Sequence, residues 1–178
     1  HTLVAGPTGM GKSVLLAMLA MQFRRYPGSR ILAFDMGRSM RATILGLGGE
    51  HYDLGMDGEI AFQPLARIDR EGYRTWAAEW IEGRLLHEGV AVGPDEKAAI
   101  WSALGSLARA PVEQRTMTGL SVLLQSNALR QALAPYVLGG AHGKLLDADL
   151  DRLGSGSVQC FEMEELMHSK AAVMAVLH

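Results

Sequence analysis

The segment Gly6–Ser13 reads GPTGMGKS and has the residue types and spacing to hold phosphate. It matches the pattern G-x-x-x-x-G-K-[ST] at every fixed position. The glycines let successive backbone amides turn inward toward phosphate oxygens, because no Cβ obstructs the approach or forbids a positive φ. Lys12 can reach the β- and γ-phosphates, and Ser13 can offer its hydroxyl to Mg²⁺. The segment therefore predicts a loop that holds a nucleoside triphosphate but does not itself cleave it.

We expect the whole loop to contact the nucleotide, with ATP and Mg²⁺ as the cofactors. Lys12 is the candidate catalytic cation, and Ser13 is the candidate Mg²⁺ ligand. Free amides at the start of the following helix add to the attraction for the anion. The expected cofactor-binding residues are Gly6, Pro7, Thr8, Gly9, Met10, Gly11, Lys12, Ser13 and Val14.

Hydrolysis needs further acids, one to hold Mg²⁺ and usually another group to orient water. Asp35 follows the apolar run Ile31–Phe34 as such an acid would, but Met36 stands where a second acid is expected. We keep Asp35 as a candidate metal ligand, with a strand-end or helix-capping carboxylate as the alternative. For Glu162, after Val158–Phe161, the capping interpretation is favoured.

The elements around the loop predict an α/β fold with a parallel sheet. Thr2–Ala5 is typical of a buried strand, Ser13–Arg25 of a helix apolar nearly all round, and Ile31–Phe34 of a second buried strand. Strand, helix and strand in this order form a βαβ unit. Ile60–Leu65 predicts a third strand broken by Pro64, and Val158–Phe161 predicts a strand that returns to the sheet.

Helical periodicity dominates from Asp69 to about Leu138, which predicts an inserted all-helical subdomain. Pro94 favours a helix start, Thr118 is expected to cap a helix through Gln125, and 127–135 predicts a further helix. Acids at Glu162, Glu164 and Glu165 predict the opening of a last helix. The expected organisation is an α/β core over 1–68, a helical insertion over 69–153 and a return to an incomplete core over 154–178.

Composition excludes several classes of protein. One cysteine in 178 residues excludes a disulfide-rich scaffold, and the formal charge of −2 gives no broad positive field for duplex DNA. The longest apolar run, Val14–Met21, is too short to span a bilayer. Trp76, Trp80 and Trp101 could stack nucleic-acid bases, but their helical spacing favours a role in the core. We therefore expect no direct nucleic-acid binding by these residues.

Several segments together resemble the TrbE-like conjugal-transfer ATPases of type IV secretion systems. The likeness covers nearly the whole chain, and the segments at 62–65 and 161–167 are more selective than the loop itself. The segments that carry it are 6–13, 14–16, 23–27, 34–35, 48–55, 62–65 and 158–167.

The resemblance implies a RecA-like P-loop NTPase domain with a helical insertion, active as a homo-hexamer at the cytoplasmic face of the bacterial inner membrane. It implies ATP-driven pilus assembly and substrate transfer, with other type IV secretion subunits as partners. It also places the magnesium-binding Asp, the catalytic Glu and an inter-subunit arginine on segments that follow His178.

Two alternatives remain on the residues alone. One is a P-loop kinase in which Asp35 lies near an acceptor hydroxyl. The other is a nucleotide-binding or scaffold module that does not hydrolyse ATP.

Overall fold

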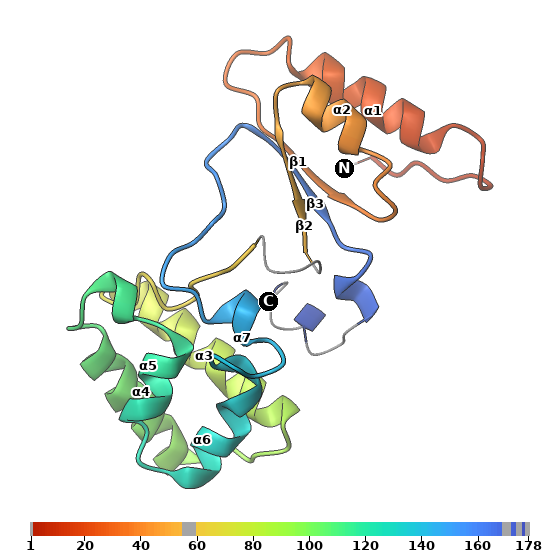
Figure 1. Ribbon diagram of the computed structural model, residues 1–178. Helices are drawn as coiled ribbons and strands as arrows, with labels where there is room; N and C mark the ends of the chain where they lie inside the picture. The colour runs from red at the N-terminus through yellow and green to blue at the C-terminus, as the bar shows by residue number, and fades with distance from the viewer. Residues whose placement is uncertain (1, 55–59, 169–171, 174–175, 177–178) are drawn as a thin grey trace. The chain divides into compact units, whose positions relative to one another are not determined.

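The computed structural model describes residues 2–54, 60–168, 172, 173 and 176, which form two compact units (Figure 1). The first unit comprises His1–Glu59 and Gly154–His168, and the second comprises Ile60–Leu153 and Ser169–His178. The first division lies at residue 60 rather than at 69, because Leu65 and Ile68 are buried in the core of the helical unit.

A parallel sheet organises the first unit. Its strands are β1 (Ile31–Asp35), β2 (Glu50–Asp53) and β3 (Val158–Glu162), in the order β1-β3-β2. The register places Asp35 and Asp53 on either side of Glu162, so an acid ends each strand at the same edge. The predicted strands at Ile31–Phe34 and Val158–Phe161 are confirmed, as is the α/β class with an incomplete core.

Two helices, α1 (Lys12–Phe23) and α2 (Arg41–Gly46), pack on one face of this sheet (Figure 1). The buried residues Ile44 and Cys160 belong to this small core, and Ala17 and Ala20 of α1 pack against it. At the entry to β2, a Cβ on Gly49 would lie 2.6 Å from atoms of Val158. Only glycine therefore lets the two segments approach this closely.

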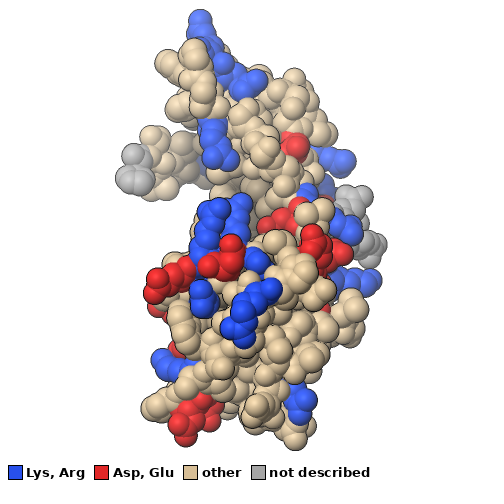
Figure 2. Space-filling model, turned by 90° about the vertical axis from the view of Figure 1, so that its left-hand side faces the viewer, with Lys and Arg blue, Asp and Glu red and all other residues tan. Residues whose placement is uncertain are grey.

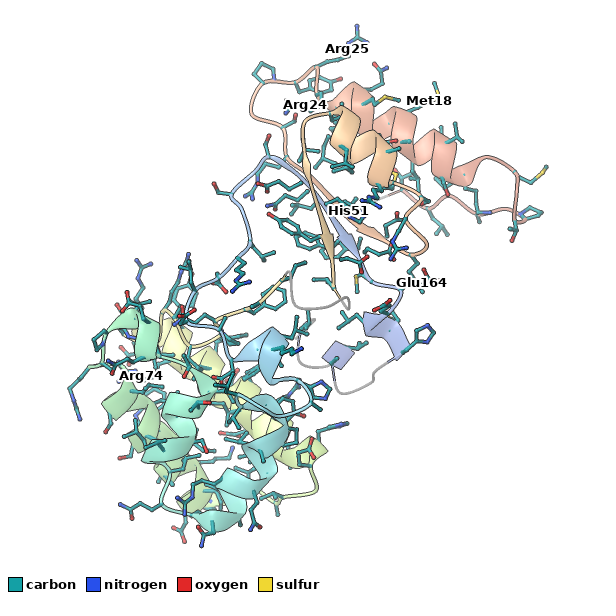
Figure 3. The ribbon with its side chains drawn as sticks, in the orientation of Figure 1. Met18, Arg24, Arg25, His51, Arg74 and Glu164 are labelled. Atoms are coloured by element: carbon teal, nitrogen blue, oxygen red, sulfur yellow. The ribbon has the colours of Figure 1, made fainter. Side chains whose placement is uncertain are left out.

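The outer side of α1 carries large apolar side chains. Val14 is 64% exposed and Phe23 is 56% exposed, and no residue of the helix is buried. Met18 and Arg25 point away from the sheet (Figure 3). The sequence predicts a helix packed on several sides, whereas within the described residues only its alanine side has neighbours in the core.

The opposite face of the sheet carries an aromatic row. The ring of Phe161 on β3 stacks on Phe34 of β1 at 5.4 Å and on Tyr52 of β2 at 5.5 Å. Beside the row, the Glu50 carboxylate accepts from Gln159 Nε2 and Tyr52 Oη, and these bonds lower the pKa of Glu50.

Two predicted strands are absent from the described sheet. Thr2–Ala5 has no ladder partner, because β1 and β2 already occupy both edges of β3 and nothing described pairs outside them. Ile60–Leu65 lies in the helical unit instead. There the amide of Phe62 donates to Leu145 O at 2.7 Å, and Ala148 N donates back to Phe62 O. Its apolar residues are thus buried against helices and not in the sheet.

The second unit is a helical bundle, as the sequence predicts. Its core includes Trp80, Leu104, Leu120 and Leu133, all nearly inaccessible to solvent. The elements are α3 (Glu71–His87), α4 (Pro94–Leu107), η1 (Val112–Gln114), α5 (Met117–Leu123), α6 (Asn127–Leu133), η2 (Ala134–Tyr136) and α7 (Gly143–Leu146).

The helix starts follow local capping. Pro94 opens α4, and Glu96 bonds back to the amide of Gly93 at 2.9 Å. Thr116, not Thr118, caps α5 by accepting from Gly119 N, because the Thr118 hydroxyl bonds Asp147. The helix ends at Leu123, before the expected Gln125, because the backbone of Leu124 is extended.

The acids that predict the opening of a last helix lie at the end of a strand and in a turn. Glu162 ends β3, a turn follows, and η3 spans Leu166–His168. Most of 169–178 lies outside the described residues. No helix in the described part of the chain combines the length and apolar character needed to cross a membrane.

Trp80 and Arg84 share the interior of the bundle. Trp80 is 1% exposed, as expected for a core residue, whereas Trp76 and Trp101 are partly exposed. Arg84 is also buried, and its guanidinium lies 5.5 Å from the Trp80 ring centroid. Its Nε and Nη1 have no hydrogen-bond partner in the described part of the chain. Burial lowers the pKa of Arg84.

We predict that Cys160, the only cysteine of the sequence, resists alkylation in the folded chain. Burial raises the pKa of the thiol to about 12, and the nearby Asp35 and Glu162 carboxylates contribute smaller shifts in the same direction. Iodoacetamide labelling at pH 8, followed by mass spectrometry, should therefore be slow in buffer and fast in guanidinium chloride. Labelling at the same rate in both solutions would contradict the buried position.

Candidate nucleotide-binding site

The loop before α1 has the conformation that its glycines permit. Gly9 and Gly11 have φ values of 83° and 78°, in the left-handed region that non-glycine residues rarely adopt. No atom lies within 4 Å of a Cβ built on either residue, so the constraint is backbone conformation and not crowding. Gly11 immediately precedes Lys12, the first residue of α1.

The N-terminus of α1 has free donors. No side chain caps it, and the amides of Lys12, Ser13 and Val14 donate to no acceptor among the described residues. Such amides carry part of the positive end of the helix dipole and favour an anion. The loop and helix start therefore provide donors of the kind that the sequence predicts for phosphate.

Lys12 lies against its own loop. Its Nζ donates to Gly6 O and to Pro7 O, both at 2.7 Å. No described carboxylate forms an ion pair with it. A lysine ammonium has three protons, so these two bonds fix its position and leave one proton for a further acceptor.

Ser13 and Asp35 have different surroundings. Ser13 is exposed in the first turn of α1, next to the free amides. Asp35 is buried at the end of β1, where its Oδ1 accepts from the Ser39 hydroxyl at 2.6 Å and its Oδ2 from Met40 N at 2.7 Å. Both carboxylate oxygens thus stabilise the turn that leads into α2. The assignment of Asp35 to magnesium stays a prediction.

Glu162 organises the acidic edge of the sheet. It is 1% exposed and accepts from three backbone amides: Gly37 N at 3.1 Å, Arg38 N at 2.6 Å and Glu164 N at 3.0 Å. Gly37 and Arg38 both have positive φ, a conformation that turns adjacent amides toward one anion. The carboxylate therefore closes the turn after β1 and caps the turn after β3.

Arg38 extends this network to the third strand. Its Nη2 lies 3.0 Å from Asp53 Oδ2, and this bond raises the pKa of Arg38. Among the described residues, Asp53 Oδ1 and, on the same strand, His51 Nε2 are buried without a hydrogen-bond partner. Figure 3 shows His51 among the side chains of the sheet. Within the described residues no group of three or more His, Cys, Asp or Glu side chains is arranged to hold a metal.

The surface drawn in Figure 2 shows Lys and Arg side chains interspersed with Asp and Glu side chains. No single-sign field dominates this face, in keeping with the near-neutral formal charge of −2.

Known proteins of conjugal transfer are similar to this chain. It is 43% identical over 175 residues to the conjugal transfer protein TrbE of Rhizobium radiobacter, across 94% of the chain. It is 42% identical over 173 residues to a probable conjugal transfer protein TrbE of Sinorhizobium fredii, again across 94% of the chain. The chain is thus similar over nearly its whole length to TrbE-like proteins. It spans 21% of the first relative and 26% of the second.

More distant relatives agree with this similarity. The TrbE-like chain is 24% identical over 161 residues to the type IV secretion system protein VirB4 of Bartonella henselae, covering 88% of the chain and 20% of that protein. The solved structure of VirB4 of Thermoanaerobacter pseudethanolicus matches with a TM-score of 0.68 at 19% identity, over 97% of the chain and 53% of that chain. This structure shows the fold. No protein-family model matches the chain.

Sequence reasoning located the loop but not the network at the acidic edge. Glu162 had a local signal, an acid ahead of a helix opening, and its bond to Glu164 N is of that kind. Its bonds to Gly37 and Arg38 join positions 125 and 124 residues apart, and no local pattern indicates them.

We predict that Glu162→Ala destabilises the chain by about 2–4 kcal/mol, because three amides lose a charged acceptor in a buried position. Urea unfolding followed by circular dichroism measures the loss. The control is Glu165→Ala, which removes an exposed acid from the following turn and should change stability by less than about 0.5 kcal/mol. Equal effects of the two substitutions would contradict the assigned role.

Proposed function

We propose that the chain is the ATP-binding portion of a type IV secretion or conjugal-transfer ATPase. The observation that carries the proposal is the loop of residues 6–13, with Gly9 and Gly11 at positive φ, free amides at the start of α1 and the Lys12 ammonium fixed on two loop carbonyls. The names of the TrbE and VirB4 relatives support the assignment to secretion and conjugation.

The residues present fit ATP and Mg²⁺. The amides from Thr8 to Val14 would surround the phosphates. The Lys12 ammonium would donate its remaining proton to the β- and γ-phosphate oxygens. The Ser13 hydroxyl would bind the metal from the first turn of α1. When bound, Mg²⁺ offsets the charge that develops on the phosphates.

Hydrolysis in this proposal belongs to the whole protein. Asp35 already uses both carboxylate oxygens in its turn, and Met36 is no acid. We therefore assign the acid pair and the inter-subunit arginine to other segments of the parent protein. That protein would act as a homo-hexamer with other secretion subunits at the cytoplasmic face of the inner membrane, and would power pilus assembly and the translocation of DNA or protein.

A second candidate follows from the same carboxylate. Because Asp35 is engaged in the turn before α2, the 178 residues by themselves could bind nucleotide without hydrolysing it. In that role the chain acts as a nucleotide-binding or scaffold module.

We predict that Lys12→Ala in the full-length protein weakens ATP binding by about tenfold or more, because a charge fixed beside the phosphates is lost. Isothermal titration calorimetry measures the affinity, and phosphate release measures the ATPase rate, which should fall at least as far. The matched control is Lys144→Ala, an exposed lysine on α7, which should leave both values unchanged. Wild-type affinity and turnover in Lys12→Ala would overturn the proposal.

We also predict that the isolated 178-residue chain binds ATP at most weakly and hydrolyses almost none. The reason is that the loop holds phosphate, while Asp35 already uses both carboxylate oxygens in its turn and Met36 stands where a second acid is expected. A phosphate-release assay on the purified chain checks this. Rapid turnover that disappears in Lys12→Ala would show that the acids of this chain suffice.

A further inference from the structure

The helical unit contains a cavity of about 590 Å³ that the nucleotide proposal does not use. Its wall includes the aromatic side chains of Phe62, Tyr73, Trp76 and Trp80. Three of these lie on α3, and the rings of Trp76 and Trp80 stack at 6.1 Å. The volume falls within the range of pockets that hold small organic molecules.

Gln63 and Asp151, two of the polar residues at the wall, are bonded to each other within the protein. The side-chain Nε2 of Gln63 donates to Val112 O at 2.5 Å, and the backbone amide of Gln63 donates to Asp151 Oδ1 at 2.6 Å. Gln63 itself is 3% exposed, so it offers little to a ligand. An occupant of the interior would therefore be held by apolar and aromatic contact and not by hydrogen bonds.

The wall carries one cation, Arg67, and one carboxylate, Asp151, whose Oδ1 already accepts from the backbone amide of Gln63. Arg67 lines the cavity, is exposed, and lies with its guanidinium 5.7 Å from the Tyr73 ring centroid. It donates to Tyr73 Oη at 3.3 Å and forms no ion pair with a described carboxylate. A cationic ligand would be repelled by Arg67, whose guanidinium already lies over the Tyr73 ring.

We propose that this cavity binds a small aromatic acid, with its rings among Tyr73, Trp76 and Trp80 and its carboxylate at Arg67. The aromatic side chains of the wall would pack against the rings of the ligand, and the exposed guanidinium of Arg67 would bind its carboxylate. The site is independent of the phosphate-binding loop, and its test does not depend on ATP.

Gly72 offers a direct way to fill the cavity. It lies in the first turn of α3 and lines the cavity, and no atom lies within 4 Å of a Cβ built on it. Gly83 lies in the same helix, is equally open, and does not belong to the wall. Leucine at either position favours the helix, so both variants are expected to fold.

The experiment titrates naphthoate, and separately the cation naphthylmethylammonium, into the full-length protein by isothermal titration calorimetry. We expect naphthoate to bind at one site, at least about tenfold more tightly than the cation. Gly72→Leu should weaken naphthoate binding by about tenfold or more, while Gly83→Leu should leave it within about twofold. Arg67→Gln should remove the preference for the anion.

Several outcomes of this experiment would contradict the proposal. Thermal unfolding of each variant first establishes that it is folded. Absence of saturable naphthoate binding would overturn the proposal, as would equal effects of Gly72→Leu and Gly83→Leu. Equal affinity for the two probes in the wild-type protein, or an unchanged preference in Arg67→Gln, would remove the assigned role of the guanidinium.

Discussion

The pairing of β3 with both of its neighbours is the constraint on which the first unit depends. β1 and β2 do not pair with each other, so every ladder bond of the described sheet involves Val158–Glu162. The same strand supplies Cys160 to the core under α1 and α2, Phe161 to the aromatic row and Glu162 to the acidic edge. Because an isolated strand cannot satisfy its backbone groups, this unit exists only when β3 is in place.

Glu162 shows how backbone pairing and local conformation support each other. The positive φ of Gly37 and Arg38 is unfavourable for the arginine, and the two bonds to the carboxylate offset that cost. The turn also allows Arg38 to reach Asp53 on β2. One buried acid on the central strand thus fixes the ends of all three strands.

Much of the architecture could be predicted from the sequence because its signals are local. The loop at Gly6–Ser13, the strands at Ile31–Asp35 and Val158–Glu162, and the start of α4 at Pro94 each follow from a few neighbouring residues. The position of Ile60–Leu65 could not be predicted in this way. Its composition suits a strand, but its partners are Leu145 and Ala148, far along the chain. Thr2–Ala5 likewise has strand composition without a described neighbour.

The continuity of residues 60–153 in one unit has a consequence for synthesis on the ribosome. The chain is made from its N-terminus at roughly 5–20 residues per second, and domains generally fold as units. Contacting helices of the bundle include the sequence neighbours α3 and α4, and α5 and α6, so residues 60–153 can begin to condense as they emerge. The phosphate-binding loop, α1, β1 and β2 are made earlier but must wait for residues 158–162 before their sheet can close. Within this chain, these earlier segments therefore acquire their tertiary structure after residues 60–153.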